Sequence, residues 1–113
     1  MSCLFDSISY FLRINSFETR QKICDYLEAN NEIMSGLDTK LLLQLEDPNY
    51  ISKMRRTTTW GGAIEIKAAS NIWNIKIIVY IDRIHNKKIE FIPISGYYIG
   101  SIGIEWQGNH YVP

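Results

Sequence analysis

The stretch SCLFDSISYFL, residues 2–12, decides how the rest of this chain is interpreted. Its apolar side chains recur every three or four positions, a spacing typical of an amphipathic helix: Leu4, Phe5, Ile8, Phe11 and Leu12. Ser2 is a good N-cap for this helix, and Asp6 suits the positive end of the helix dipole. Cys3 is therefore predicted at the first helical position, where the dipole favours a nucleophilic thiolate. The alternative is that Cys3 is a small buried hydrophobic residue.

Length and composition indicate one globular domain, residues 1–113. Hydrophobic residues make up 46% of the chain, enough for a single core. The formal net charge is zero, which gives no reason to expect nucleic acid as a partner. No apolar run is long enough to span a bilayer, and no basic segment precedes the first apolar run as in a signal peptide. We therefore expect no membrane association.

The cysteine and histidine content argues against a disulfide framework and a zinc site. Cys3 and Cys24 are the two cysteines, and His85 and His110 are the two histidines, at wide and irregular spacing. We expect a reducing compartment, namely the cytoplasm, and no metal or other cofactor. Cys24 lies beside the apolar stripe of a second helix and is interpreted as structural.

Four more helices are predicted before the first strand. The second covers 17–29 with Ser16 as its cap, and the third is a short leucine-rich helix after Asp38. The fourth begins at Pro48 and ends near residue 54, close to Arg55 and Arg56. The fifth follows Trp60-Gly61-Gly62 and covers about 63–73, with Glu65 facing away from its apolar stripe.

The strands come last. Residues 75–81 are rich in β-branched side chains and predict a buried strand. Shorter strands are predicted over 88–94, ending at Pro93, over 102–106 and over 110–112. His85 falls in a polar turn and is expected to be exposed. Helices followed by strands predict an α+β domain with a small, mostly antiparallel sheet packed with helices.

Cys3 and His110 form a candidate catalytic pair from opposite ends of the chain. A cysteine protease needs a thiolate as nucleophile and an imidazole as general base and acid, and the two need only meet in space. On its own this pairing is weak, because any chain with one cysteine and one histidine would qualify.

Four local motifs add to this pair. They are C-L-F-D-S-I-S, then T-W-G-G-A-I-E-I-K-A-A-S, the strand I-K-I-I-V-Y, and N-H-Y-V-P. In order and spacing the chain, from Ser2 to Val112, resembles the ovarian tumour (OTU) family of cysteine deubiquitinases. Its shortness and high isoleucine content look like a viral member of that family.

The resemblance implies a fold, an activity and a set of roles. The implied OTU-like fold is a small, mostly antiparallel sheet packed between helical regions. The implied activity is hydrolysis of the isopeptide bond after the C-terminal glycine of ubiquitin, with Cys3 as nucleophile and His110 as general base. Tyr111 would be the usual aromatic neighbour of the histidine, and Trp60 and Gly61 would shape the fold beside the site. Ubiquitin or polyubiquitin chains, and in some viral members ubiquitin-like modifiers, would be the partners of a monomer.

The chain departs from the family pattern in two places. Members usually carry Asp-Gly-x before the cysteine, as part of the oxyanion hole, but only Met1 and Ser2 precede Cys3 here. Many members also carry Asp or Asn two residues after the histidine, where this chain has Val112. The candidate substitutes for the third catalytic residue are Asp6, Glu105 and Asn109.

These departures leave several interpretations open. The chain is expected to be either part of a longer protein or a short protein of weak or no activity. A non-catalytic ubiquitin-binding module and a viral polyprotein-processing protease are the alternatives to a deubiquitinase.

Overall fold

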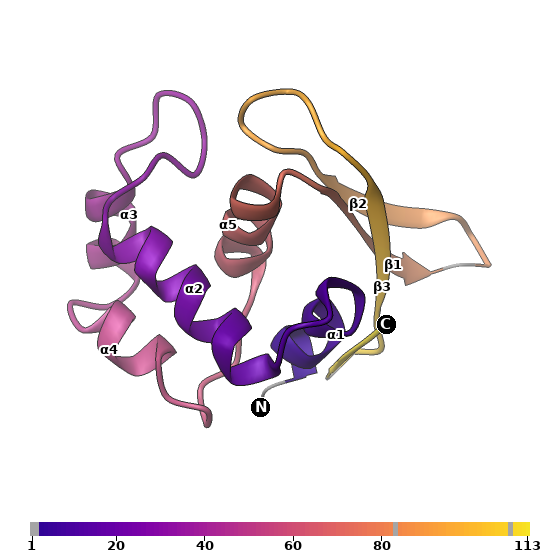
Figure 1. The fold of residues 1–113 in the computed structure, drawn as a ribbon, viewed down its shortest axis with the longest axis horizontal. Coiled ribbons are helices and arrows are strands. Elements are labelled where there is room, and N and C mark those ends of the chain that lie inside the picture. The colour runs from indigo at the N-terminus through magenta and orange to yellow at the C-terminus, as the bar shows by residue number, and fades with distance from the viewer. Residues whose placement is uncertain (1–2, 83, 109) are drawn as a thin grey trace.

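The chain folds as an α+β domain, shown in Figure 1 as a computed structural model that describes residues 3–82, 84–108 and 110–113. In these residues the helices are α1 (Cys3–Leu12), α2 (Ser16–Glu28), α3 (Thr39–Glu46), α4 (Tyr50–Met54) and α5 (Ala63–Trp73). The strands are β1 (Lys76–Asp82), β2 (Lys87–Phe91), β3 (Ser101–Trp106) and β4 (Tyr111–Val112). The predicted fold class is confirmed.

The four strands form one sheet in the order β2-β1-β3-β4. Both outer pairs are antiparallel, whereas the central pair, β1 and β3, is parallel, with Ile77 opposite Ile102. The parallel pair arises because the segment 92–100 carries the chain across β1 before β3 begins. As a result β4, which follows the tight turn after β3, forms the edge of the sheet opposite β2.

All five helices lie on the same side of the sheet in Figure 1. Helix α1 packs against β3 and β4, and α5 packs against β1 and β2. Side chains of β1 alternate accordingly: Ile77 and Val79 are buried under the helices, whereas Lys76 forms an ion pair with Glu90 on the other face at 3.2 Å. The sheet is thus covered by helices on one face of the described chain, not packed between two helical regions as the resemblance implied.

Two predicted helix starts need correction. The cap of α2 is Asn15, whose side chain accepts a hydrogen bond from the Glu18 N–H at 2.6 Å, and not Ser16. Helix α4 begins at Tyr50 and not at Pro48, because the Asp47 carboxylate accepts the Asn49 N–H at 2.7 Å and forms a turn there. The predicted cap of α1, Ser2, lies outside the described residues.

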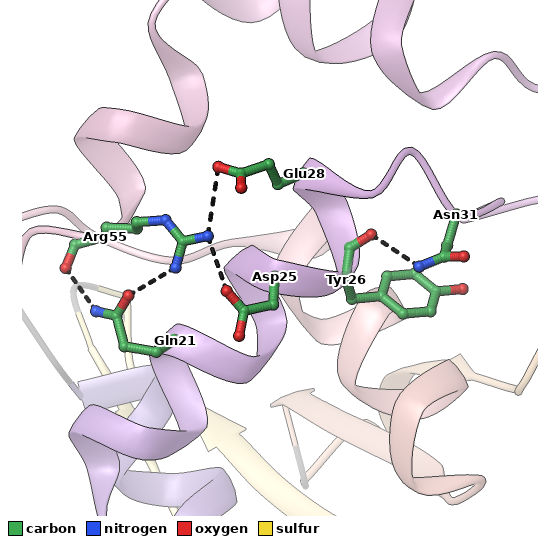
Figure 2. Close-up of polar contacts among 6 residues, drawn as sticks. All are labelled: Gln21, Asp25, Tyr26, Glu28, Asn31 and Arg55. Atoms are coloured by element: carbon green, nitrogen blue, oxygen red, sulfur yellow. Dashed lines mark hydrogen bonds and ion pairs between the residues drawn. The ribbon is translucent and has the colours of Figure 1, made fainter.

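Arg55 joins the end of α4 to α2, as Figure 2 shows. Its guanidinium lies 2.8 Å from Asp25 and 3.4 Å from Glu28, and it donates a hydrogen bond to the Gln21 side chain at 2.8 Å. The Gln21 amide in turn donates to the Arg55 carbonyl oxygen at 3.0 Å. Arg55 is therefore an inter-helix link, while the neighbouring Arg56 is exposed.

The core lies between the helices and the sheet. Cys24 is completely buried in it, as predicted, but Phe17 is 61% exposed and does not belong to the buried stripe of α2. Two of the four leucines of α3, Leu41 and Leu45, are exposed as well, and Leu43 is its buried leucine. No helix in the described part of the chain is both long and apolar enough to cross a membrane.

Candidate active site

Cys3 lies at the beginning of α1 and is partly exposed. The next two residues, Leu4 and Phe5, are completely buried, so the first turn of α1 is anchored in the core while Cys3 remains accessible to solvent. The Ser7 hydroxyl donates a hydrogen bond to the Cys3 carbonyl oxygen at 2.8 Å. The first N–H groups of a helix have no partner within the helix, so they are available to a negative charge that develops beside Cys3.

Gly61 fixes the first turn of α1 from outside the helix. A methyl group added at Gly61 would lie 2.7 Å from Leu4 Cδ2 and 2.9 Å from two ring atoms of Phe5. No other residue type fits such a close approach of backbone to side chains. Gly61 therefore determines how the first turn of α1 packs, whereas the side chain of Trp60 is 51% exposed beside it.

His110 lies next to Tyr111, at the start of the edge strand β4. Its carbonyl oxygen accepts the Gln107 N–H at 2.9 Å, which closes the turn after β3, and Tyr111 then pairs with Trp106. Because α1 packs against β4, the end of the chain that carries Cys3 and the strand that follows His110 lie side by side (Figure 1). The structure thus places α1 beside β4. That the Cys3 thiol and the His110 imidazole react together remains a prediction.

Tyr111 lies in β4 and is partly buried. Burial is the main cause that raises the pKa of its phenol. Its ring also packs on Trp106, with centroids 4.8 Å apart. Tyr111 is therefore a neutral, partly buried residue that lines the site.

Among the three candidates for the third catalytic residue, Glu105 lies in β3. It is opposite Val112, and the Gln107 amide donates to its carboxylate at 3.1 Å. Glu105 also pairs with Tyr80 of β1, so it belongs to the face of the sheet turned away from the helices, whereas Ile77 and Val79 belong to the helix-covered face. Asp6 is exposed on α1, and Asn109 lies outside the described residues.

An apolar cavity of about 200 Å³ begins at this site and extends between α5 and the sheet. Trp106 and Tyr111 form one end, and Ile89 and Phe91 form the other. A second, almost entirely apolar cavity of about 410 Å³ shares Ala63 and Phe91 with the first and continues toward the loop before α3. These two adjoining cavities are together named the apolar groove.

Glu65 is the functional candidate that the sequence interpretation missed. It is 1% exposed, although its predicted position off the apolar stripe of the helix gave no sign of such burial. The signal that could have revealed it is its position three residues after Gly62, where a Glu side chain bonds back to the N-cap N–H. Among residues 3–82, 84–108 and 110–113, no group of three or more His, Cys, Asp or Glu side chains could hold a metal ion.

These features define a small α+β domain in which the helix that begins at a cysteine packs against the edge strand that follows a histidine. The family model described as "OTU-like cysteine protease" matches residues 2–104. The chain therefore belongs to the OTU-like cysteine protease family. The match includes Cys3 and ends before His110.

Individual relatives agree with the family. The Schizosaccharomyces pombe protein named "Putative ubiquitin thioesterase otu1" is 30% identical over 76 residues, which are 67% of this chain and 22% of that protein. A structure of an OTU domain in complex with ubiquitin is 25% identical, with a TM-score of 0.76 over 97% of this chain and 61% of that one. This chain thus spans less than two thirds of either relative.

Two more distant structures share the fold. The viral OTU domain protease from Dera Ghazi Khan virus is 20% identical, with a TM-score of 0.69 over 97% of this chain and 71% of its own. An OTU deubiquitinase from Wolbachia pipientis wMel, bound to ubiquitin, is 17% identical, with a TM-score of 0.66 over 99% of this chain and 88% of its own.

Proposed function

We propose that this chain is a cysteine-dependent deubiquitinase that hydrolyses the isopeptide bond after the C-terminal glycine of ubiquitin. The observation that carries the proposal is the packing of α1, which begins at Cys3, against β4, which follows His110. Membership of a cysteine protease family supports it, as do the name of the fission-yeast relative and the ubiquitin complexes of two similar structures.

The reaction follows from the two side chains. The Cys3 thiolate attacks the carbonyl carbon of the substrate glycine, and the oxyanion that forms is bound by N–H groups at the start of α1. As the carbon–nitrogen bond breaks, His110 gives a proton to the departing lysine amine and a thioester remains on Cys3. His110 then takes a proton from water, which attacks the thioester carbon; the carbon–sulfur bond breaks, the ubiquitin carboxylic acid leaves and loses its proton to solvent, and the Cys3 thiolate and protonated His110 are restored.

The apolar groove supplies a binding site for the end of the substrate. Its lining includes Trp106 and Tyr111, and Tyr111 is the residue next to His110. An extended chain with apolar side chains lies best in such a groove, because each buried side chain contributes about 1 to 3 kcal/mol of transfer free energy.

A ubiquitin probe with an electrophilic C-terminus tests this function. Covalent capture by the parent and by Cys24→Ala, and none by Cys3→Ala, is the expected result. Reversible binding of ubiquitin without capture would instead establish the non-catalytic module. Cleavage of peptide junctions without capture of the ubiquitin probe would favour a polyprotein-processing protease.

Glu105 is proposed as an acceptor that helps to position His110, because its carboxylate accepts the Gln107 side-chain amide and the Gln107 N–H donates to the His110 carbonyl oxygen. Loss of an orienting acceptor costs serine proteases about 10⁴ in kcat, and a thiolate nucleophile tolerates it better. Glu105→Gln is therefore expected to lower kcat by about ten- to a hundredfold. Glu18→Gln, an exposed carboxylate on α2, is the control. An unchanged kcat in Glu105→Gln would exclude this role.

A further inference from the structure

A buried acid lies beneath the Gly61-Gly62 segment and takes no part in the reaction described above. Glu65, in the first turn of α5, accepts the Gly62 N–H at 2.7 Å with one carboxyl oxygen and the Tyr50 hydroxyl at 2.5 Å with the other. Burial, and then the negative charge of Glu65, raise the pKa of the Tyr50 hydroxyl, so this group remains a donor. Both oxygens are thus satisfied by donors from α4 and from the segment before α5.

The first of these hydrogen bonds leads directly to the catalytic helix. Because the Gly62 N–H is held by Glu65, the peptide between Gly61 and Gly62 has a fixed orientation. The backbone of Gly61 in turn packs on Leu4 and Phe5 so closely that no side chain would fit there. Glu65 therefore determines where the first turn of α1 can lie.

Phe5 is also held from a second direction. The guanidinium of Arg20 lies 4.0 Å from the centre of the Phe5 ring, and its Nη1 donates to the Met54 carbonyl oxygen at 2.8 Å. Arg20 is itself 1% exposed, and burial lowers the pKa of its guanidinium. The Phe5 ring is thus enclosed by the buried Arg20 and by Gly61, and the N–H of the residue after Gly61 is held by Glu65.

Burial of this acid exceeds what a helix cap requires. A Glu at the third helical position caps equally well at the surface, and transfer of a carboxyl group into the interior is unfavourable unless its contacts compensate. One of the two compensating hydrogen bonds here, from the Gly62 N–H, leads to the segment that holds the first turn of α1, and the other comes from Tyr50 of α4. On this basis, and resting on the function proposed above, we propose that Glu65 is a positioning residue that holds Cys3 in its reactive geometry.

The test uses the full chain and two readouts. One is the rate at which iodoacetamide alkylates Cys3, followed by mass spectrometry; the other is kcat and KM for a fluorogenic ubiquitin C-terminal substrate. Glu65→Ala is expected to lower the alkylation rate and kcat by about tenfold or more, because displacements of about 1 Å have such effects, and to leave KM within about twofold. Glu65→Gln retains an oxygen acceptor for the Gly62 N–H and is expected to restore most of the loss.

Asn71→Ala is the matched control for stability. Asn71 also holds α5 to other segments through polar contacts. Its side chain donates to the Ile33 carbonyl oxygen at 3.1 Å and accepts the Ile94 N–H at 2.8 Å, away from α1. It is expected to lower Tm without changing the alkylation rate of Cys3. If Asn71→Ala and Glu65→Ala lowered the alkylation rate of Cys3 equally, Glu65 would have only a structural role and the proposal would be overturned.

Two further outcomes are decisive. If Glu65→Ala does not fold, Tyr50→Phe, which removes one of the two hydrogen bonds, must still lower Cys3 reactivity, and parent-like reactivity there overturns the proposal. If the parent does not hydrolyse the ubiquitin substrate, the proposed function fails. The alkylation rates of the Glu65 variants then decide the positioning role separately.

Discussion

At the scale of single residues, the two cysteines differ in their access to solvent. Cys3 is partly exposed at the beginning of α1, whereas Cys24 is completely buried on α2. Burial is the main cause that raises the pKa of the Cys24 thiol to about 11. A protonated, enclosed thiol is a poor nucleophile, so the reactivity of the protein should reside in Cys3.

The first prediction follows from this difference. Cys3→Ala should abolish hydrolysis and leave Tm close to that of the parent, because the side chain of Cys3 is not enclosed by the core. Cys24→Ala should retain activity and lose about 1 kcal/mol of stability, as is typical of a modest core truncation. Hydrolysis assays and urea unfolding of both variants check this, and activity in Cys3→Ala would refute the assignment of the nucleophile.

The second prediction concerns stability against pH at Glu65. Burial raises the pKa of this carboxyl above its ordinary 4.5, although hydrogen bonds from Tyr50 and Gly62 oppose the effect. Between the unfolded and folded pKa values the folded state binds more protons, so Glu65 contributes stability below pH 4.5 that is lost as pH rises through the folded pKa. Relative to Glu65→Gln, the parent should therefore lose stability as pH rises from about 4.

Thermal unfolding of both proteins across this pH range measures the effect. Gln does not titrate. As pH rises, the Tm of Glu65→Gln should therefore increase relative to the Tm of the parent. A difference that is independent of pH would mean that the pKa of Glu65 is the same in the folded and unfolded states.

At the scale of elements, α1 depends on a segment without regular structure. Gly61 packs on Leu4 and Phe5 at distances that leave no room for a methyl group. Gly61→Ala should therefore displace the start of α1, destabilise the fold by about 1 to 3 kcal/mol and lower kcat. Gly100→Ala is the control, because a methyl group there meets nothing within 4 Å. Equal stability and activity of the two variants would show that the Gly61 contact can relax.

At the scale of the whole molecule, α5, the sheet and the loop before α3 enclose the apolar groove that ends at the candidate site. Ile89 lines this groove and is nevertheless 49% exposed, so it is free to contact a substrate. Ile89→Ser should raise KM for the ubiquitin substrate by about five- to tenfold and leave kcat and Tm unchanged. Ile99→Ser, at an 84% exposed position outside the groove, should change none of these values.

Local patterns in the sequence were sufficient for the elements and for the family. The three- and four-residue spacing in α1 and α5, the β-branched run of β1 and the cap at Asp38 all act between near neighbours. They therefore predicted these elements within a few residues. The cysteine and Trp-Gly-Gly motifs likewise indicated the OTU family, which the family match confirmed.

Contacts between distant segments were decided by the tertiary structure. The same spacing that assigned Glu65 to α5 could not reveal its partner Tyr50, because that hydrogen bond joins residues 15 positions apart. The parallel pairing of β1 with β3, and with it the place of β4 beside α1, likewise depends on which strands meet. Periodicity specifies which face of an element is apolar, but only the packing of the folded chain specifies what that face contacts, and the candidate site consists of such contacts.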